Sequence, residues 1–518
     1  MSDMRTFQGS PKLVLYGFSP DTPEEIFSRV AHGAKPSSLK GDFILVAEGV
    51  DARTGDSLIV FVSTVIAAIP YYYTITAGRC VHAPDVFTCC QQAKLSWTWD
   101  WEAVADLALF DHVIGDRSLH AAIHRIPAAS VVTICGNTVQ SETEPFWTTL
   151  YQNLRYDARS ENAANVVMDI LSEVPASQPI ALSLSAGYDS RVLLAALTHQ
   201  QRDVQTATMG DSQATDARIA QQLATSVHDP FTRVELTPDD YVRNAREILT
   251  CTSGEKVFTH WHTGIYANRA PFTSSQLHIA GSNGEFARST LCDKGMFAQA
   301  LDAFPILNWQ TWITRQHQAQ NWIVPDLVRA LGTQTPFARA LNAKTLLREV
   351  PVGEYCFGDG LDVFYATQRV RNFIGLGVAL YRNHWPTMSP FLDARFITYS
   401  AHLPRHEKLA NRLPRKIIQQ LQPKLLDFPT DERGVPMRVK PSLIYFRKHA
   451  QVRGYQQYRA AQALPQVQQW ARAGYQVLSG GQKEYVPDQA YQWNFGITIG
   501  AILDVLQEKG ISLSSSTL

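Results

Sequence analysis

From about residue 160 onward, short apolar strand-like runs alternate with amphipathic helical segments, and this alternation limits the possible folds more than any other feature of the chain. The expected strands are PIALSLS, VQTATMG, TRVEL and LHIAG, and the expected helices are NAANVVMDILSEV, SRVLLAALTHQ and TDARIAQQLATSV. Strands joined through helices pair in parallel, because each crossover returns the chain to the same end of the sheet. We therefore expect an α/β domain in which helices cover both faces of a parallel sheet.

The first 150 residues follow a different pattern. Short runs rich in β-branched and aromatic residues, bounded by turn residues, predict a β-rich domain, and these runs are FILVAEGV, DSLIVFVST, PYYYTITAG and ASVVTICGN. A chain of 518 residues is too long for one hydrophobic core. Residues 148–160 lack strong strand character, so we expect domains at residues 1–150 and 151–518, the second mostly helical beyond residue 290.

Composition and charge exclude several classes of protein. The 47 basic side chains balance the 47 acidic ones, which argues against a nucleic-acid-binding surface. The sequence has no signal peptide and no run of ~18 apolar residues, so we expect a cytoplasmic protein without a membrane partner. The seven cysteines show no C-x-x-C pair and no matching histidine spacing, so the sequence indicates neither a zinc site nor a disulfide framework, and we expect reduced thiols.

The strand that ends at Leu184 runs directly into Ser185-Ala186-Gly187-Tyr188-Asp189-Ser190, and a helix is expected to begin at about Ser190. The first N–H groups of a helix and its dipole attract anions, and serine hydroxyls and a glycine beside them suit phosphate. Asp189 is placed to hold a magnesium ion that bridges phosphate oxygens. The alternative is a capped helix with Asp189 as a solvated turn residue. The spacing is neither that of a P-loop nor G-x-G-x-x-G.

This stretch resembles the S-G-G-x-D-S signature of the ATP pyrophosphatases, with Ala186 in place of one glycine. Within that superfamily the chain is similar to the asparagine synthetase group, which includes β-lactam synthetases and lasso-peptide cyclases. The segments that carry the resemblance, in family order, are Gly41-Asp42-Phe43, Ile69-Pro70-Tyr71-Tyr72, HRIPAASVVTI, Pro145-Phe146-Trp147, TATMGDSQATDARIAQQLA, IAGSNGEFAR and SPFLDARFITYSAHLP. It implies a class II glutamine amidotransferase-like domain of the Ntn-type β-sandwich fold at 1–150. At 151–518 it implies an ATP-pyrophosphatase domain, adenine nucleotide alpha hydrolase-like, with a helical C-terminal part.

The resemblance also implies ATP and Mg²⁺ as cofactors. Asp189 and Glu285 would be the catalytic magnesium ligands, and backbone at Thr208 and Met209 would face adenine, while Asp216 would open the next helix. The full set of implied nucleotide contacts is Leu184, Ser185, Ala186, Gly187, Tyr188, Asp189, Ser190, Arg191, Thr208, Met209, Gly281, Ser282, Asn283 and Gly284.

Several positions depart from the family pattern. Glutaminases of this type use a cysteine directly after Met1, but this chain has Ser2, and its first cysteine is Cys80. The family loop G-E-G-x-D-E is replaced here by GSNGEF, so that Glu285 is either a longer magnesium ligand or a solvated loop residue. Pro386 stands where many relatives have a glutamate. The family lysine is missing from DFPTDERGVPMR, and the nearby cations, each also readable as a surface charge, are Lys424, Arg433, Arg438 and Lys440.

These features predict an AMP- and pyrophosphate-forming amide ligase that works without glutamine. A substrate carboxylate would attack the α-phosphorus of ATP, and an amine would then displace AMP. Lasso macrolactam formation is one candidate, with a precursor peptide and a protease as partners. Amidation of a small acid or sugar acid with ammonia or a small amine is another, and a non-catalytic ATP-binding scaffold is a third. Sulfur transfer ranks last, because Cys251 and Cys292 are isolated.

Overall fold

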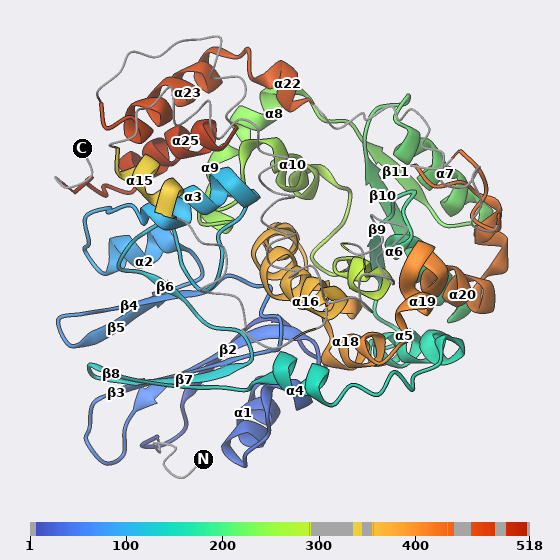
Figure 1. Ribbon diagram of the computed structural model, residues 1–518, viewed down its shortest axis with the longest axis horizontal. Coiled ribbons are helices and arrows are strands. Elements are labelled where there is room, and N and C mark those ends of the chain that lie inside the picture. The colour runs from blue at the N-terminus through green and yellow to red at the C-terminus, as the bar shows by residue number, and fades with distance from the viewer. Residues whose placement is uncertain are drawn as a thin grey trace.

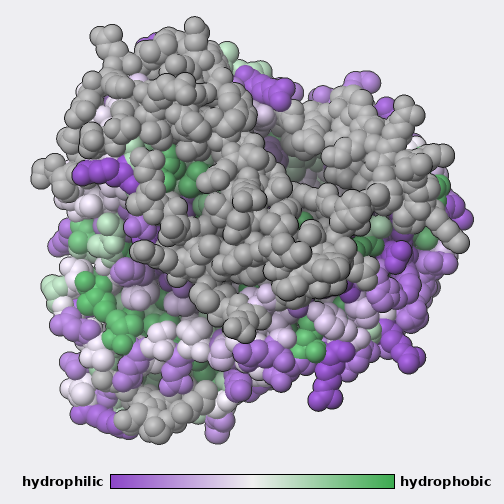
Figure 2. All heavy atoms as spheres, viewed as in Figure 1, coloured by the Kyte–Doolittle hydropathy of each residue, from purple (hydrophilic) through white to green (hydrophobic). Residues whose placement is uncertain are grey.

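The computed structural model describes residues 7–289, 291, 335–343, 355, 357–431, 434–439, 457–481 and 494–514. Antiparallel sheets form the N-terminal region, and a five-stranded parallel sheet follows later in the chain (Figure 1). None of the helices in these ranges is long and apolar enough to cross a membrane. In Figure 2, hydrophilic and hydrophobic side chains are interspersed over the described part of the face drawn.

The N-terminal region contains two antiparallel sheets that pack face to face. The larger sheet has the order β1-β2-β3-β7-β8, and the smaller has the order β5-β4-β6. Along β3 (Ser57–Ser63), Ile59 and Phe61 pack toward the smaller sheet, whereas Leu58, Val60 and Val62 join the core beneath α1. Successive side chains of a strand point to opposite faces, and both faces of β3 are buried. The predicted β-rich domain is therefore confirmed as a region of antiparallel sheet.

The elements of this region have the following bounds: β1 Lys12–Phe18, α1 Pro23–Ala31, η1 Pro36–Ser38, β2 Asp42–Val50, β3 Ser57–Ser63, β4 Tyr72–Thr76, β5 Arg79–Ala83, α2 Val86–Gln92, α3 Trp101–Phe110, β6 His124–Arg125, β7 Ser130–Cys135, β8 Thr138–Thr143 and α4 Phe146–Gln152.

The parallel sheet has the order β11-β10-β9-β12-β13. Its central strand, β9, packs Ile180 and Leu182 against α5, α6 and α20 on one face and Ala181 toward the α10 side on the other. Apolar residues on both faces explain why PIALSLS reads as a continuous apolar run rather than an alternating one. The predicted succession of strands and helices is confirmed here, while β13 was not predicted.

The corresponding bounds are η2 Ser160–Asn162, α5 Ala163–Ser172, β9 Ile180–Ser183, α6 Asp189–His199, β10 Val204–Met209, α7 Thr215–Ser226, β11 Phe231–Val234, α8 Pro238–Arg243, α9 Ala245–Cys251, η3 Phe258–His260, α10 His262–Arg269, β12 Leu277–Ile279 and η4 Gly284–Arg288. Beyond residue 290 the described part is mostly helical, as expected. It comprises α15 Pro336–Ala343, α16 Phe357–Phe364, the π-helical η5 Tyr365–Ile374, α17 Gly375–Arg382, β13 Thr387–Met388, η6 Pro390–Leu392, α18 Ala394–Ala401, α19 Arg405–Lys408, η7 Leu409–Asn411, α20 Arg412–Leu421, η8 Pro423–Asp427, α22 Tyr458–Ala461, α23 Pro465–Leu478 and α25 Asn494–Glu508.

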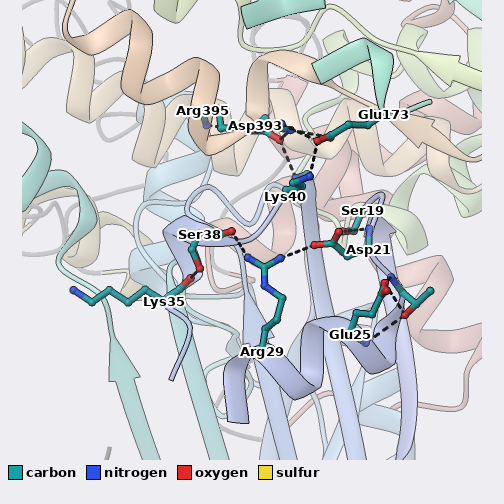
Figure 3. A network of polar contacts seen from close by, with 12 residues as sticks. Ser19, Asp21, Glu25, Arg29, Lys35, Ser38, Lys40, Glu173, Asp393 and Arg395 are labelled. Atoms are coloured by element: carbon teal, nitrogen blue, oxygen red, sulfur yellow. Dashed lines mark hydrogen bonds and ion pairs between the residues drawn. The ribbon is translucent and has the colours of Figure 1, made fainter. Parts of the chain in front are cut away.

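The P-F-L-D segment joins the two regions through its aspartate (Figure 3). The Asp393 carboxylate caps α18 by accepting from the Arg395 N–H at 2.9 Å, and it also accepts from the Gly41 N–H at 3.0 Å. Arg395 and Lys40 both pair with Glu173, each at 2.8 Å. Since Gly41 and Lys40 belong to the antiparallel region and Glu173 follows α5, this network fixes one region against the other.

We expect Asp393→Ala to lower the stability of the chain by about 2–3 kcal/mol, because it removes a helix cap and a charged hydrogen bond at a buried position. The measurement is urea unfolding followed by tryptophan fluorescence. Asp21→Ala is the matched control, because Asp21 pairs with Arg29 at a more exposed position and its loss should cost under about 1 kcal/mol. Equal unfolding midpoints for the two variants would contradict the role assigned to Asp393.

Candidate functional site

The two predicted phosphate loops lie at the point where the strand order of the parallel sheet reverses. The chain leaves β9 toward β10 and β11 on one side, whereas β12 pairs with β9 on the other side. Loops that follow two such strands leave a crevice between them at the carboxyl edge, which is where ligands bind in open α/β sheets. Residues 184–188 and 280–284 occupy these two positions.

The first loop is shaped by its two serines. The Ser190 hydroxyl accepts from the Ser185 N–H at 3.0 Å, and the two hydroxyl oxygens are 2.8 Å apart. The Gly187 N–H donates to Ser185 Oγ at 3.2 Å. These bonds hold the turn over the start of α6, so that the hydroxyls and the first helical N–H groups gather in one place, as an anion site requires.

Asp216 at the start of α7 supports this loop in a way that the sequence analysis missed. Its Oδ1 accepts from the Ala186 N–H at 2.6 Å. Burial raises the pKa of Asp216 to about 6, although the bond from Ala186 acts in the opposite direction. The sequence marked Asp216 only as a helix opener, because its partner lies 30 residues away along the chain.

Arg191 fastens the first loop to the C-terminal part of the chain. Its buried guanidinium donates to the carbonyl oxygen of Ala186 at 2.8 Å and to those of Phe428 and Pro429 at 2.9 and 2.6 Å. Burial lowers the pKa of Arg191 to about 10. A phosphate contact by Arg191 stays a prediction. The Arg191 side chain already donates to these carbonyl oxygens, so the backbone N–H of Arg191 would make that contact.

The second loop touches the first through two glycines. A Cβ atom built on Gly284 would lie 2.3 Å from Cγ of Asp189, and one built on Gly281 would lie 3.1 Å from the Ser190 nitrogen. A methyl group at Gly284 would overlap the Asp189 side chain, and one at Gly281 would make a tight contact with the start of α6. The loops therefore meet at the Asp189 carboxylate.

Arg288 lies between the two predicted carboxylates. Its Nη2 is 2.8 Å from Asp189 Oδ2 and 3.9 Å from Glu285 Oε1. Burial raises the pKa of Asp189, and Glu285 raises it further, whereas Arg288 opposes the rise. Burial alone would lower the pKa of Arg288, but the two carboxylates outweigh this and raise it. Sequence reasoning missed Arg288, although its spacing three residues after Glu285 on a helical turn was a usable signal.

The donor set around Arg288 fits magnesium. Asp189 and Glu285 direct oxygen atoms at one cationic centre, and Mg²⁺ is held in proteins by one or two carboxylates together with water and phosphate oxygens. No group of three or more histidine, cysteine or acidic side chains suited to a metal occurs in the described ranges. A magnesium ion held by these two carboxylates would complete its coordination with phosphate and water oxygens.

Asn283 connects the second loop to the P-F-L-D segment. Its backbone is left-handed, with φ of 75°, and its Nδ2 donates to the Phe391 carbonyl at 2.7 Å. Asn283 Oδ1 is buried and has no hydrogen-bond partner within the residues described. Two motifs that looked separate in the sequence are therefore one structural unit.

The other predicted residues are distributed as follows. Thr208 and Met209 end β10 next to β9, Leu184 and Tyr188 are buried in the first loop, and Ser282 is half-buried in the second. Lys424 donates to the Ser226 carbonyl at an exposed position, and Arg438 pairs with Asp427, so that both have surface partners. Ser2, Cys292, Arg433 and Lys440 lie outside the described residues.

Comparison of the chain with models of known protein families gave no match, and comparison with curated proteins gave none either. The resemblance to asparagine synthetases therefore rests on the sequence motifs alone.

We expect Gly284→Ala to destabilise the chain by about 1–3 kcal/mol, because the added methyl group overlaps the Asp189 side chain. Placing the same substitution in an Asp189→Gly background should remove most of this cost, since the overlapping atoms are then absent. Urea unfolding of the wild type, the two single variants and the double variant measures the coupling free energy between positions 189 and 284. Gly377→Ala is the control, because its Cβ would meet no atom closer than 3.4 Å. Additive effects of the two substitutions would contradict the contact.

Proposed function

We propose that the chain is an ATP-dependent amide ligase that forms AMP and pyrophosphate and does not hydrolyse glutamine. The observation that carries this proposal is the meeting of two glycine-containing loops around Asp189 at the strand-order reversal of a parallel sheet. The N-terminal region would be a glutaminase-like Ntn-type domain without its nucleophile, and the parallel-sheet region an ATP-pyrophosphatase domain.

The residues of the two loops would divide the work as follows. The hydroxyls of Ser185 and Ser190 and the N–H groups at the start of α6 would hold the phosphates that depart as pyrophosphate. Asp189 and Glu285 would hold magnesium, which would neutralise charge on the leaving group. Arg288 could then pass from Asp189 to a phosphate oxygen, since it is already within 2.8 Å of that carboxylate.

Three described cysteines of the N-terminal region are poorly suited to the attack on glutamine that a glutaminase nucleophile makes, which supports another amine source. Burial raises the pKa of the thiols of Cys80 and Cys90, each to about 12, and it also raises the pKa of Cys89. Such thiols are almost wholly protonated at neutral pH and are poor nucleophiles. The amine would therefore come from solution or from the acyl substrate itself, and lasso macrolactam formation is the narrower form of the second route.

Amidation with free ammonia and a non-catalytic scaffold remain the alternatives. One observation favours the scaffold: Arg288 already neutralises the carboxylate that magnesium would need. An exchange measurement separates the two classes, because a scaffold binds ATP without breaking its α–β phosphoanhydride bond.

We expect Asp189→Asn to lower ATP–pyrophosphate exchange at least about 100-fold, because it removes a magnesium ligand from the step that releases pyrophosphate. The assay uses the full chain, Mg·ATP, labelled pyrophosphate and a panel of peptide and small carboxylic acids. Asp169→Asn is the matched control on the exposed side of α5. Wild-type binding of Mg·ATP without any exchange would support the scaffold, and undiminished exchange by Asp189→Asn would overturn the proposed site.

A further inference from the structure

A buried lysine, Lys256, lies on a segment whose backbone is held firmly in place. The Trp261 indole N–H donates to the Lys256 carbonyl oxygen at 2.8 Å, and the Phe258 N–H donates to Thr498 Oγ1 at 2.9 Å. The positive φ of Ser253 and Gly254 turns the chain just before this segment. The backbone at Lys256 is therefore held by bonds that do not involve its amine.

The Lys256 amine has no ion-pair partner among the residues that the structure describes. The residue is only 3% exposed, and its Nζ lies 4.8 Å from the centre of the Phe373 ring. Within the described ranges, no carboxylate lies within ion-pair distance of this amine. Burial, reinforced by the like charge of Arg369, lowers the pKa of Lys256 to about 7. A buried cation without a counter-ion costs folding free energy, and such costs concentrate at binding and catalytic sites.

The groups around Lys256 form a cluster, which we call the Phe373 cluster: Lys256, His260, His262, Arg369 and Phe373. The Arg369 guanidinium carbon is 4.4 Å from the centre of the Phe373 ring, and the His260 ring meets the same ring edge-on at 4.7 Å. The centres of the His260 and His262 rings are 6.1 Å apart. Two side chains that can carry positive charge thus share one aromatic ring.

The two imidazoles of the cluster stay neutral at neutral pH. Burial lowers the pKa of His260 well below its usual value, with Lys256 adding to the effect, and lowers the pKa of His262 to about 4. The Asp111 carboxylate lies at the C-terminal end of α3, close enough to Arg369 for that positive charge to lower its pKa, although burial raises it. The cluster therefore has a net positive character, and its buried amine is not neutralised by a described carboxylate.

The segment η5 connects this cluster with the two loops. Tyr365, at its start, is buried close enough to Glu285 and Asp189 for their charges to act on its hydroxyl, and Arg369 follows one turn later. The N-terminal region holds the end of η5 in place, since Arg125 donates to Asn372 Oδ1 at 2.7 Å. π-Helical segments are rare and frequently occur at functional sites.

We propose that the Phe373 cluster binds the carboxylate of a small-molecule or peptide ligand, with the Lys256 ammonium as its ion partner. One amine and one guanidinium beside an aromatic ring suit a singly charged group on an apolar body, whereas phosphate has its own predicted place at the start of α6. That the ligand is the acyl substrate rests on the proposed function, but the site itself does not.

Pyridoxal 5′-phosphate tests the site without knowledge of the natural ligand. Its aldehyde condenses with a neutral amine and releases water, and borohydride then reduces the imine to a stable secondary amine. At pH 7.5 a lysine with a pKa of about 7 has a neutral fraction roughly several hundredfold larger than that of an ordinary lysine. We expect mass mapping of the full chain to find Lys256 labelled fastest, with protection by millimolar small carboxylic acids.

Lys408 is the internal control, because it is equally buried but pairs with Asp362 at 3.2 Å. Labelling of Lys256 no faster than that of Lys408 would overturn the proposal. Protection by inorganic phosphate or pyrophosphate, but by none of the carboxylic acids, would also overturn it. Arg369→Gln should weaken protection by the carboxylic acids while it leaves Lys256 reactive.

A second measurement, of stability against pH, needs no ligand. The pKa of Lys256 is lower in the folded chain than in the unfolded one, so wild-type stability should rise relative to Lys256→Met between about pH 7 and pH 10. The difference in stability between the two proteins largely excludes the titration of the other charged groups, because both proteins contain Asp111, His260, His262 and Arg369. Lys256→Met should melt above the wild type at pH 7, and this gap should close toward pH 10. A variant that is less stable than the wild type by the same margin at both pH values would overturn the proposal.

Neither measurement uses ATP. The labelling and melting experiments can therefore contradict the carboxylate site while ATP–pyrophosphate exchange supports the proposed function. The reverse outcome is equally distinguishable.

Discussion

The contact between Gly284 and Asp189 is the constraint on which the arrangement of the site depends. Two loops that are separated by about a hundred residues along the chain approach so closely that one residue can have no side chain and the other must point its carboxylate across the gap. Arg288 then pairs with that carboxylate, which would otherwise be left partly buried beside Glu285. The close approach is possible because β9 and β12 are neighbours in a parallel sheet, so that the loops after them share one edge.

The elements that were predictable from the sequence are those with strong local patterns. The apolar runs that contain β3 and β9 were each predicted as strands, and both strands are confirmed. The two-residue strand β13 was missed, because Thr387 and Met388 carry no periodic pattern and become a strand only by pairing with β12. The metal and nucleotide contacts of the two predicted loops stay predictions.

At the site, the sequence did not reveal Arg288 or the bonds made by Asp216 and Arg191, because the partners of all three are distant in sequence. Asp216, Arg191 and Arg288 each act through a bond to another segment, and a single sequence does not contain those pairings. Lys256 was missed for a different reason. Its surroundings depend on Phe373 and Arg369, more than a hundred residues later, so nothing near it in the sequence distinguishes it from a surface lysine. Together these cases indicate that local pattern specifies the scaffold, whereas the electrostatics of the site arise from tertiary packing.

The buried Arg191 gives the chain a mechanical property. One guanidinium donates to the carbonyl oxygen of Ala186 and to those of Phe428 and Pro429. A displacement of either segment would therefore strain its hydrogen bonds to Arg191 and displace the other segment. Occupancy at the edge of the sheet would consequently be transmitted, through a rigid planar group rather than through a flexible loop, to a stretch of chain more than two hundred residues downstream.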